Sequence, residues 1–134
     1  MVRLLYVSVS TLSHLNAISE VAAIVETAIE KNARLGVTGA LIYTGAHFAQ
    51  ALEGEEGPIE ELMQSIRADP RHRSILEVHR DGLTDRRFAT WAMAYRGQAS
   101  YVDQPIEKLL TVQSEAEKSR AIARVYAIMT EFVT

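Results

Sequence analysis

The order of strand and helix patterns restricts the fold of this chain more than any other feature of its sequence. Residues 2–9 and 37–43 are mostly apolar, β-rich runs that are typical of buried strands. Between them, residues 18–32 repeat apolar side chains at intervals of three and four, which predicts an amphipathic helix that ends before Gly36. Residues 47–53 form a third strand pattern, close enough to the second for a hairpin.

The second half of the pattern repeats the alternation. A second amphipathic helix is predicted over 55–68, with Pro58 in its first turn, and strands follow at about 74–79 and 91–95. The resulting order is strand, helix, hairpin, helix, strand, strand. Two crossover helices on one sheet predict an α+β fold, a ferredoxin-like βαββαββ sandwich.

The last part of the chain is helical in character. Pro105 is interpreted as the start of a short helix over 106–112, and residues 114–117 form a capping box for a final amphipathic helix. We expect this helical pair to cover the face of the sheet that the first two helices leave bare. The predicted units are therefore 1–96, the sheet with its helices, and 97–134, a C-terminal helical cap that packs on the sheet or forms an oligomer interface.

Composition excludes several classes of function. The chain has 134 residues and no cysteine, which rules out disulfides, thiol nucleophiles and cysteinyl adducts. Its four histidines lack the close spacing of a zinc site, so no metal is expected. A net charge of −3 gives no broad attraction for nucleic acid. No run approaches the ~20 apolar residues of a membrane span, and no secretory signal is visible. We therefore expect a cytoplasmic protein that binds neither nucleic acid nor membrane.

One polar residue stands out on a predicted strand face. Strand alternation places Gln50 on the same face as Phe48 and Leu52, which predicts that its amide points inward. An unpaired buried amide group costs ~1–3 kcal/mol, so Gln50 needs partners. Tyr6 shares a face with Leu4 on the first strand. Strands one and three are the central neighbours of a ferredoxin-like sheet, so the two polar side chains can meet. The pair is either an ordinary core contact or a phenol that supplies an electron and a proton beside an amide that can turn.

Two helices present matching residues. On the first helix, Ile24 and Asn32 lie on one stripe, and on the second helix Ile66 occupies a comparable inward position. Two isoleucines on neighbouring helices could hold a flat ring between them, with Asn32 at its polar edge. Plain helix packing, and an asparagine near a helix end, are the ordinary alternatives.

Further candidates follow along the chain. Arg71 and His72 come directly after the second helix and could hydrogen-bond a ring carbonyl or meet phosphates, although a basic cluster is more often solvated surface. Trp91 and Met93 share one face of the last strand, a pair that is more often core than cofactor contact. Each feature is weak by itself, but together they form a pattern.

Five blocks in this order resemble the BLUF family, the sensors of blue light using flavin. The similarity extends over about residues 2–95. The blocks are Leu5-Tyr6-Val7-Ser8, Asn32-Ala33-Arg34-Leu35-Gly36-Val37-Thr38-Gly39, Phe48-Ala49-Gln50-Ala51-Leu52-Glu53-Gly54, Asp69-Pro70-Arg71-His72 and Arg87-Phe88-Ala89-Thr90-Trp91-Ala92-Met93.

The resemblance implies FAD, bound non-covalently between the two helices. In the family's pattern Tyr6 is the photochemical donor of an electron and a proton. Gln50 would be the amide between Tyr6 and the N5 and C4 carbonyl of the flavin. Asn32 would bond the polar edge of the ring, which Ile24 and Ile66 would flank.

The resemblance assigns the remaining candidates as well. Arg71 and His72 would lie on the side of the pyrimidine edge, and Trp91 with Met93 would be the strand pair whose packing beside Gln50 changes on signalling. These expectations describe a blue-light photoreceptor and not an enzyme. Its output would pass to an unidentified effector protein or to a homodimer or larger homo-oligomer.

Two alternatives without flavin stay open at the level of sequence. One is a small ferredoxin-like regulatory module. The other is an acylphosphatase-like hydrolase, which needs a phosphate-binding loop with an arginine after the first strand. Residues 7–16 contain neither glycine nor arginine, which counts against the hydrolase.

Overall fold

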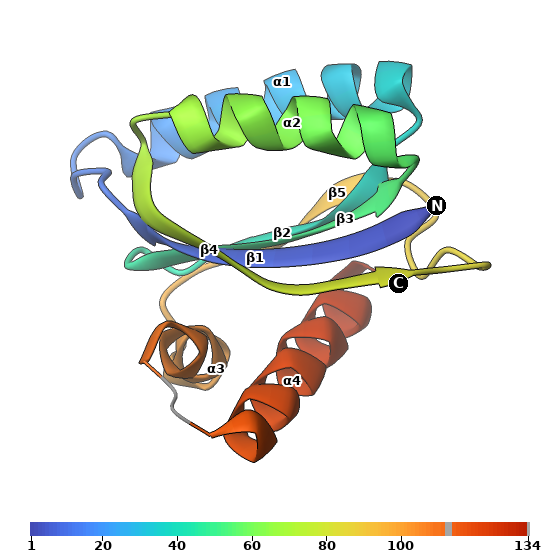
Figure 1. The fold of residues 1–134 in the computed structure, drawn as a ribbon. Coiled ribbons are helices and arrows are strands. Elements are labelled where there is room, and N and C mark those ends of the chain that lie inside the picture. The colour runs from blue at the N-terminus through green and yellow to red at the C-terminus, as the bar shows by residue number, and fades with distance from the viewer. Residues whose placement is uncertain (112–113, 134) are drawn as a thin grey trace.

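A five-stranded sheet carries one pair of helices on each of its faces in the computed structural model, which describes residues 1–111 and 114–133 (Figure 1). The elements are β1 (Val2–Ser10), α1 (Ala17–Leu35), β2 (Thr38–Tyr43), β3 (His47–Gly54), α2 (Glu56–Ala68), β4 (His72–Gly82), β5 (Trp91–Arg96), α3 (Ser100–Thr111) and α4 (Glu115–Val133).

The strand order is β4-β1-β3-β2-β5. β1 pairs antiparallel with both β3 and β4, β2 pairs antiparallel with β3, and β5 adds parallel to β2 at the edge. This confirms the predicted α+β, ferredoxin-like fold with β1 and β3 as central neighbours. Register then follows from the pairing: Tyr6 lies directly opposite Gln50.

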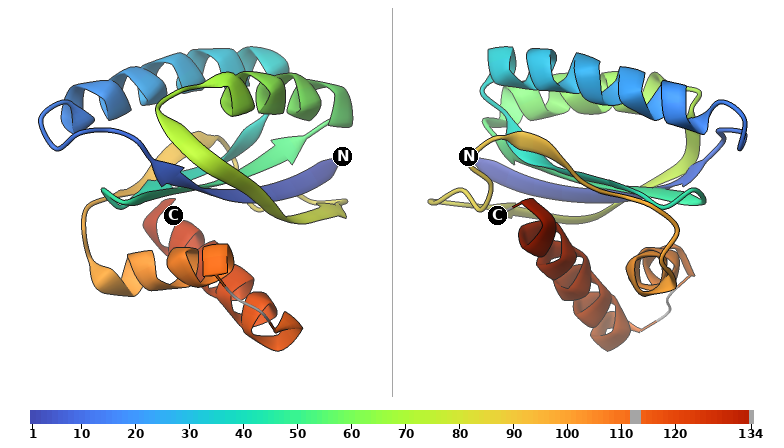
Figure 2. Two further views of the ribbon diagram at one scale, coloured as in Figure 1. Left: turned by 60° about the vertical axis from the view of Figure 1, so that its left-hand side comes forward. Right: turned by 180° about the vertical axis from the view of Figure 1, so that it is seen from behind.

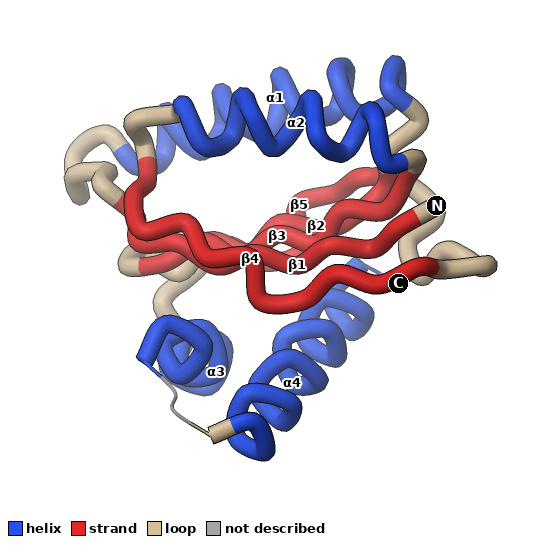
Figure 3. Tube along the Cα trace, viewed as in Figure 1, coloured by secondary structure: helices blue, strands red, loops and turns tan. Residues whose placement is uncertain are grey.

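Strand alternation divides the interior into two cores, one on each side of the sheet. Leu4, Tyr6 and Leu52 face α1 and α2, whereas Leu5 and Val7 face the other way. The second core is closed by α3 and α4, which lie together on the face of the sheet opposite α1 and α2 (Figures 2 and 3). The expectation that the C-terminal helices cover the bare face is therefore confirmed for the described residues. Without them, this apolar face would be in water.

Two glycines of the Asn32–Gly39 segment have a steric explanation. Gly36 caps α1 in the left-handed conformation, with φ at 68°, and its N–H bonds back to the carbonyl of Ala33. Gly39 lies in β2 where the backbone passes close to β3. A Cβ at this position would run into the carbonyl oxygen of Ala51. The segment thus ends a helix and lets the next strand approach its neighbour.

The start of α3 differs from the prediction. The helix begins at Ser100 and not at Pro105, which lies inside it. A proline there removes one backbone hydrogen bond. Val102, Pro105 and Ile106 are nevertheless buried against the sheet, and this burial stabilises the first turn. Val112, the predicted end of this helix, lies outside the described residues.

The other boundaries agree more closely with prediction. The backbone N–H of Glu117 donates to the Ser114 hydroxyl at 3.0 Å, as expected for a capped α4. β4 is longer than the predicted 74–79 and starts at His72. His72 is therefore a strand residue paired with Ser10, not part of a loop.

Candidate functional site

A cavity of about 200 Å³ lies between α1 and α2, above the central strands. Seven of the predicted site residues line it from five different elements or their ends: Tyr6, Ile24, Asn32, Gln50, Ile66, Arg71 and His72. Trp91 and Met93 do not line it. The fold therefore brings most of the candidates to one place, although they are spread over more than sixty positions of sequence between Tyr6 and His72.

Three buried side chains form a hydrogen-bonded row beneath the cavity. The amide Nε2 of Gln50 donates to the hydroxyl of Tyr6 at 2.7 Å, and its Oε1 accepts from the indole Nε1 of Trp91 at 2.8 Å. The three are only 3–7% exposed. Both ends of the amide are thus satisfied, by a side chain from β1 and one from β5, as a buried amide requires.

The indole decides which way the amide points. Trp91 Nε1–H can only donate a hydrogen bond, so it must face the amide oxygen. A rotated Gln50 would set its N–H₂ group against the indole N–H, two donors without an acceptor. The present orientation of the amide therefore depends on Trp91 staying where it is. The hydrogen bond between Trp91 and Gln50 could have been anticipated from the sequence, because a buried tryptophan usually finds an acceptor.

The Tyr6 hydroxyl keeps its proton. Burial raises the pKa of Tyr6 well above its usual value, and the negative charge of Asp69 adds to the rise, while the bond from Gln50 opposes it. Because the Tyr6 oxygen accepts from Gln50, the phenol proton is free to be donated to another acceptor. At neutral pH this residue is a neutral phenol with a proton to give.

Met93 lies beside the row and not in it. Its partly buried side chain packs on the core that includes Trp91 and Leu41, beneath α1. The two β5 residues thus share the face predicted for them, but only Trp91 makes a polar contact with Gln50. The predicted strand pair is placed next to the amide and outside the cavity lining.

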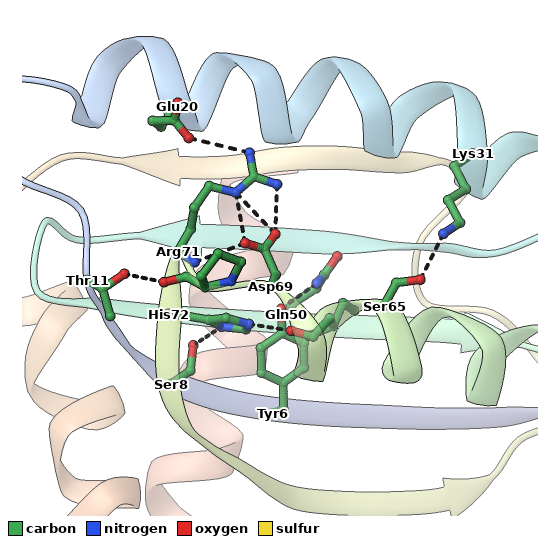
Figure 4. Close-up of polar contacts among 12 residues, drawn as sticks. Tyr6, Ser8, Thr11, Glu20, Lys31, Gln50, Ser65, Asp69, Arg71 and His72 are labelled. Carbon is green, nitrogen blue, oxygen red and sulfur yellow. Dashed lines mark hydrogen bonds and ion pairs between the residues drawn. The ribbon is translucent and has the colours of Figure 1, made fainter.

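His72 is held by two hydrogen bonds at the end of the cavity near the start of β4 (Figure 4). Its Nε2 lies 2.7 Å from the Ile66 carbonyl oxygen and its Nδ1 lies 2.7 Å from the Ser8 hydroxyl. A carbonyl can only accept, so Nε2 carries a proton, and in the neutral ring Nδ1 accepts from Ser8. The ring also contacts the edge of Tyr6, with centroids 6.1 Å apart. Sequence reasoning missed Ser8 as the residue that orients this imidazole.

Arg71 is bound to carboxylates rather than extended into solvent. Its Nε and terminal nitrogen donate to the Asp69 carboxylate at 2.9 and 2.7 Å, and Glu20 of α1 lies 3.7 Å from the other terminal nitrogen (Figure 4). The hydrogen bonds that Arg71 donates to the Asp69 carboxylate lower the pKa of Asp69 and raise the pKa of Arg71. The guanidinium therefore stays charged at this end of the cavity. Asp69, like Arg71, lines the cavity, a role that sequence reasoning did not assign.

A further contact crosses between the two helices. Lys31 of α1 donates to the Ser65 hydroxyl of α2 at 3.1 Å, and both residues line the cavity (Figure 4). Beside Lys31, Asn32 is buried and also lines the cavity. Lys31 was not singled out from the sequence, because a lysine on a helix is usually a solvated side chain.

The arrangement fits a flat, apolar ring with a polar edge. The walls are aliphatic, from Ile24 and Ile66, and the hydrogen-bonding groups of Asn32 and Gln50 lie on the same cavity. Among the described residues, no group of three or more His, Asp or Glu side chains could hold a metal ion. In the same part of the chain, no helix has the length and apolarity of a membrane span.

Known proteins match this chain over most of its length. Residues 1–94 match the family BLUF, described as sensors of blue-light using FAD. The photoactivated adenylate cyclase subunit beta of Euglena longa is 32% identical over 112 residues, 83% of this chain and 13% of the cyclase. This chain thus spans a small part of the curated relatives it matches.

Solved structures agree. The dark-state structure of the BLUF protein BlrB is 32% identical, with 94% of each chain covered and a TM-score of 0.72. Klebsiella pneumoniae BlrP1, solved with FMN and cyclic diGMP, is 30% identical, with 95% of this chain and 34% of that one covered and a TM-score of 0.69.

Proposed function

The chain belongs to the BLUF family, the sensors of blue light using FAD, and we propose that it is a photoreceptor that binds FAD non-covalently between α1 and α2. The observation that carries this proposal is the buried row Tyr6–Gln50–Trp91 beside a cavity lined by Ile24 and Ile66 of the two helices. Apolar side chains would fill this core without three polar groups to satisfy, so a polar row at this place favours a functional role.

Five of the lining residues have a proposed part in holding the flavin. Ile24 and Ile66 would flank the ring from the two helices, and Asn32 would bond its polar edge. His72 and the charged guanidinium of Arg71 would lie at the pyrimidine side. The cavity lining supports these assignments, because all five residues line the same space.

The photochemistry would depend on what Tyr6 and Gln50 do. When bound, a flavin absorbs blue light and becomes a strong oxidant. Tyr6 would give an electron and its hydroxyl proton to the flavin and would then recover both. Gln50 would relay that proton only after its amide oxygen has turned toward Tyr6, because in the structure its nitrogen donates to the Tyr6 oxygen. The net chemistry is zero. What persists is an amide of Gln50 that has rotated or tautomerised.

The row also implies what a rotated amide does to Trp91. Rotation exchanges the amide oxygen for N–H₂ at the indole, and the 2.8 Å bond to Trp91 is then lost. Trp91, with Met93 beside it, would repack. This local change of hydrogen-bond partners is the proposed signal, and β5 would carry it away from the cavity.

Output would pass to a partner, because the proposed cycle leaves no chemical product. We propose an effector protein or a change in a homodimer or larger homo-oligomer. The apolar faces of α3 and α4 are buried against the sheet, so an oligomer interface would use other surfaces. Exposed large apolar side chains among the described residues are Met1, Leu15, Ile18, Ile29, Leu76, Tyr101 and Phe132. Size-exclusion chromatography in darkness and under blue light tests for a change of oligomer.

Purification of the full chain tests the function directly. The protein should be yellow or take up FAD on reconstitution, and blue light should shift its flavin absorption reversibly to the red. Extraction of the pigment and chromatography against FAD and FMN standards identifies the nucleotide. A chain that binds no flavin would refute the proposal and favour a regulatory module instead. Gln50→Leu should keep the flavin and lose the normal shift, and a fully retained photocycle would refute the role of Gln50.

A further inference from the structure

Glu53 is a carboxylate that is fully buried on the side of the sheet opposite Gln50. The two residues are three positions apart on β3, so their side chains leave the strand on different faces. The Glu53 carboxylate accepts from the backbone N–H of Arg87 at 2.9 Å and of Phe88 at 2.8 Å. The Arg3 guanidinium contributes two more contacts at 2.7 and 2.6 Å. Burial of a charge is costly, and these four contacts from three residues offset it. Glu53 therefore fastens the segment that precedes β5.

The same segment is attached to α4. The Arg87 guanidinium lies 4.9 Å from the centre of the Tyr126 ring, a cation–π contact, and the Phe88 side chain is buried in the core beneath α4. The Tyr126 hydroxyl lies 3.0 Å from His79 Nδ1 on β4. Movement of residues 87–88 would thus first change the contacts of Tyr126.

Trp91 follows this segment after two residues, Ala89 and Thr90. The Thr90 carbonyl accepts from the N–H of Gly39 on β2. This hydrogen bond fixes the backbone between Phe88 and Trp91 to the sheet. Phe88, which packs beneath α4, is three positions from Trp91, whose indole bonds Gln50. Each residue spans at most ~3.6 Å of chain, so the two are closely linked. One short stretch of backbone therefore connects the two faces of the sheet.

We propose that Glu53 is a positioning residue that, by clamping residues 87–88, transmits the state of the Gln50–Trp91 bond to α4 through the contact of Arg87 with Tyr126. The inference rests on the proposed function, because it takes rotation of Gln50 as the event that displaces Trp91. With its amides held by Glu53, the segment cannot absorb that displacement locally. The contact between Arg87 and Tyr126 is then altered, and α4 responds.

A physical pathway needs a measured coupling between its ends. The full chain with FAD is compared in darkness and under blue light by hydrogen–deuterium exchange at residues 121–129 of α4, with the flavin red shift recorded on the same samples. Arg87→Gln removes the closer of two cation–π contacts to the Tyr126 ring, at an exposed side chain, and keeps the backbone bond to Glu53. The Arg3 guanidinium, 5.9 Å from the same ring centre, stays in place. Arg124→Gln, an exposed arginine of α4 itself, is the matched control. Glu53→Gln tests the clamp.

In the wild-type protein, light should raise exchange in α4. Arg87→Gln should keep the red shift and raise dark exchange by roughly two- to fivefold, the factor that one exposed cation–π contact supplies. The ratio of α4 hydrogen exchange in the light to that in the dark should approach one in this variant. A purely structural role would raise exchange in both states and leave that ratio unchanged. Arg124→Gln should behave as the wild type does, and Glu53→Gln should lose the ratio at least as fully as Arg87→Gln.

The outcomes separate this inference from the proposed function. A wild-type red shift without a light response in α4 would overturn the inference and leave the photoreceptor function intact. The same holds if Arg87→Gln keeps the wild-type ratio, a result that stands even if Glu53→Gln fails to fold. A wild-type protein with bound FAD and no red shift would overturn the proposed function, and the inference with it.

Discussion

Replacing Tyr6 by phenylalanine separates the structural from the photochemical role of its hydroxyl. The ring stays, so no large cavity forms, and the lost atom is the oxygen that accepts from Gln50 at 2.7 Å. The amide N–H is then left without its partner in a site that is 6% exposed. Leaving one buried donor unsatisfied costs about 1–3 kcal/mol of the free energy of unfolding. For a domain of this size, that lowers the melting temperature by roughly 3–15 °C.

Thermal and urea unfolding of the flavin-free chain measure this cost, and a double-mutant cycle identifies its source. In a Gln50→Leu background the orphaned N–H no longer exists, so Tyr6→Phe should cost at least about 0.5 kcal/mol less than in the wild type. Equal costs in both backgrounds would refute the reasoning, since the bond between the two side chains would then contribute nothing. With FAD bound, Tyr6→Phe should also abolish the red shift under blue light while retaining the flavin. A normal photocycle in this variant would show that Tyr6 is not the donor.

Two further predictions concern the close approach of β2 to β3 at Gly39 and the pH dependence of stability that His79 confers. Gly39→Ala places a methyl group against the backbone of β3, so this variant should yield little folded protein. The soluble fraction and its circular dichroism measure the yield. A wild-type melting curve would contradict the close approach of the two strands. Burial lowers the pKa of His79, with opposing charges from Asp81 on one side and Arg3 and Arg87 on the other. The unfolded chain therefore binds this proton first, so the stability contributed by neutral His79 is present above about pH 6.5 and lost as the pH falls. The urea midpoint should drop between pH 7 and 5.5, and less so in His79→Gln; equal drops would assign the effect to other groups.

Much of the site could be predicted because the direction of its side chains follows the residue periodicity of each strand and helix. Alternation on β1 and β3 was enough to place Tyr6 and Gln50 on one face, and the fold class then made their strands neighbours. The stripe that carries Ile24 and Asn32 likewise follows from the helical repeat. These residues line the predicted cavity because side-chain direction along a regular element is set by the backbone itself.

Long-range partners could not be predicted in this way. The indole of Trp91 meets Gln50 only because β5 adds beside β2 in a particular register, and the pattern of β5 alone is equally compatible with a plain core residue. Arg71 could have pointed to solvent, but the corner after α2 directs it to Asp69 and Glu20. Pro105 suggested a helix start, and burial against the sheet overrode that local preference.

The sequence by itself determined most elements, their inward faces and the strand faces that carry Tyr6 and Gln50, since periodicity and strand alternation are properties of the local chain. Only the tertiary structure decided the amide orientation of Gln50, the oriented imidazole of His72 and the clamp at Glu53. Each of these is a choice of hydrogen-bond partner between segments that are far apart in sequence. Such choices depend on register and close packing, because buried polar groups take the partner that geometry brings within reach.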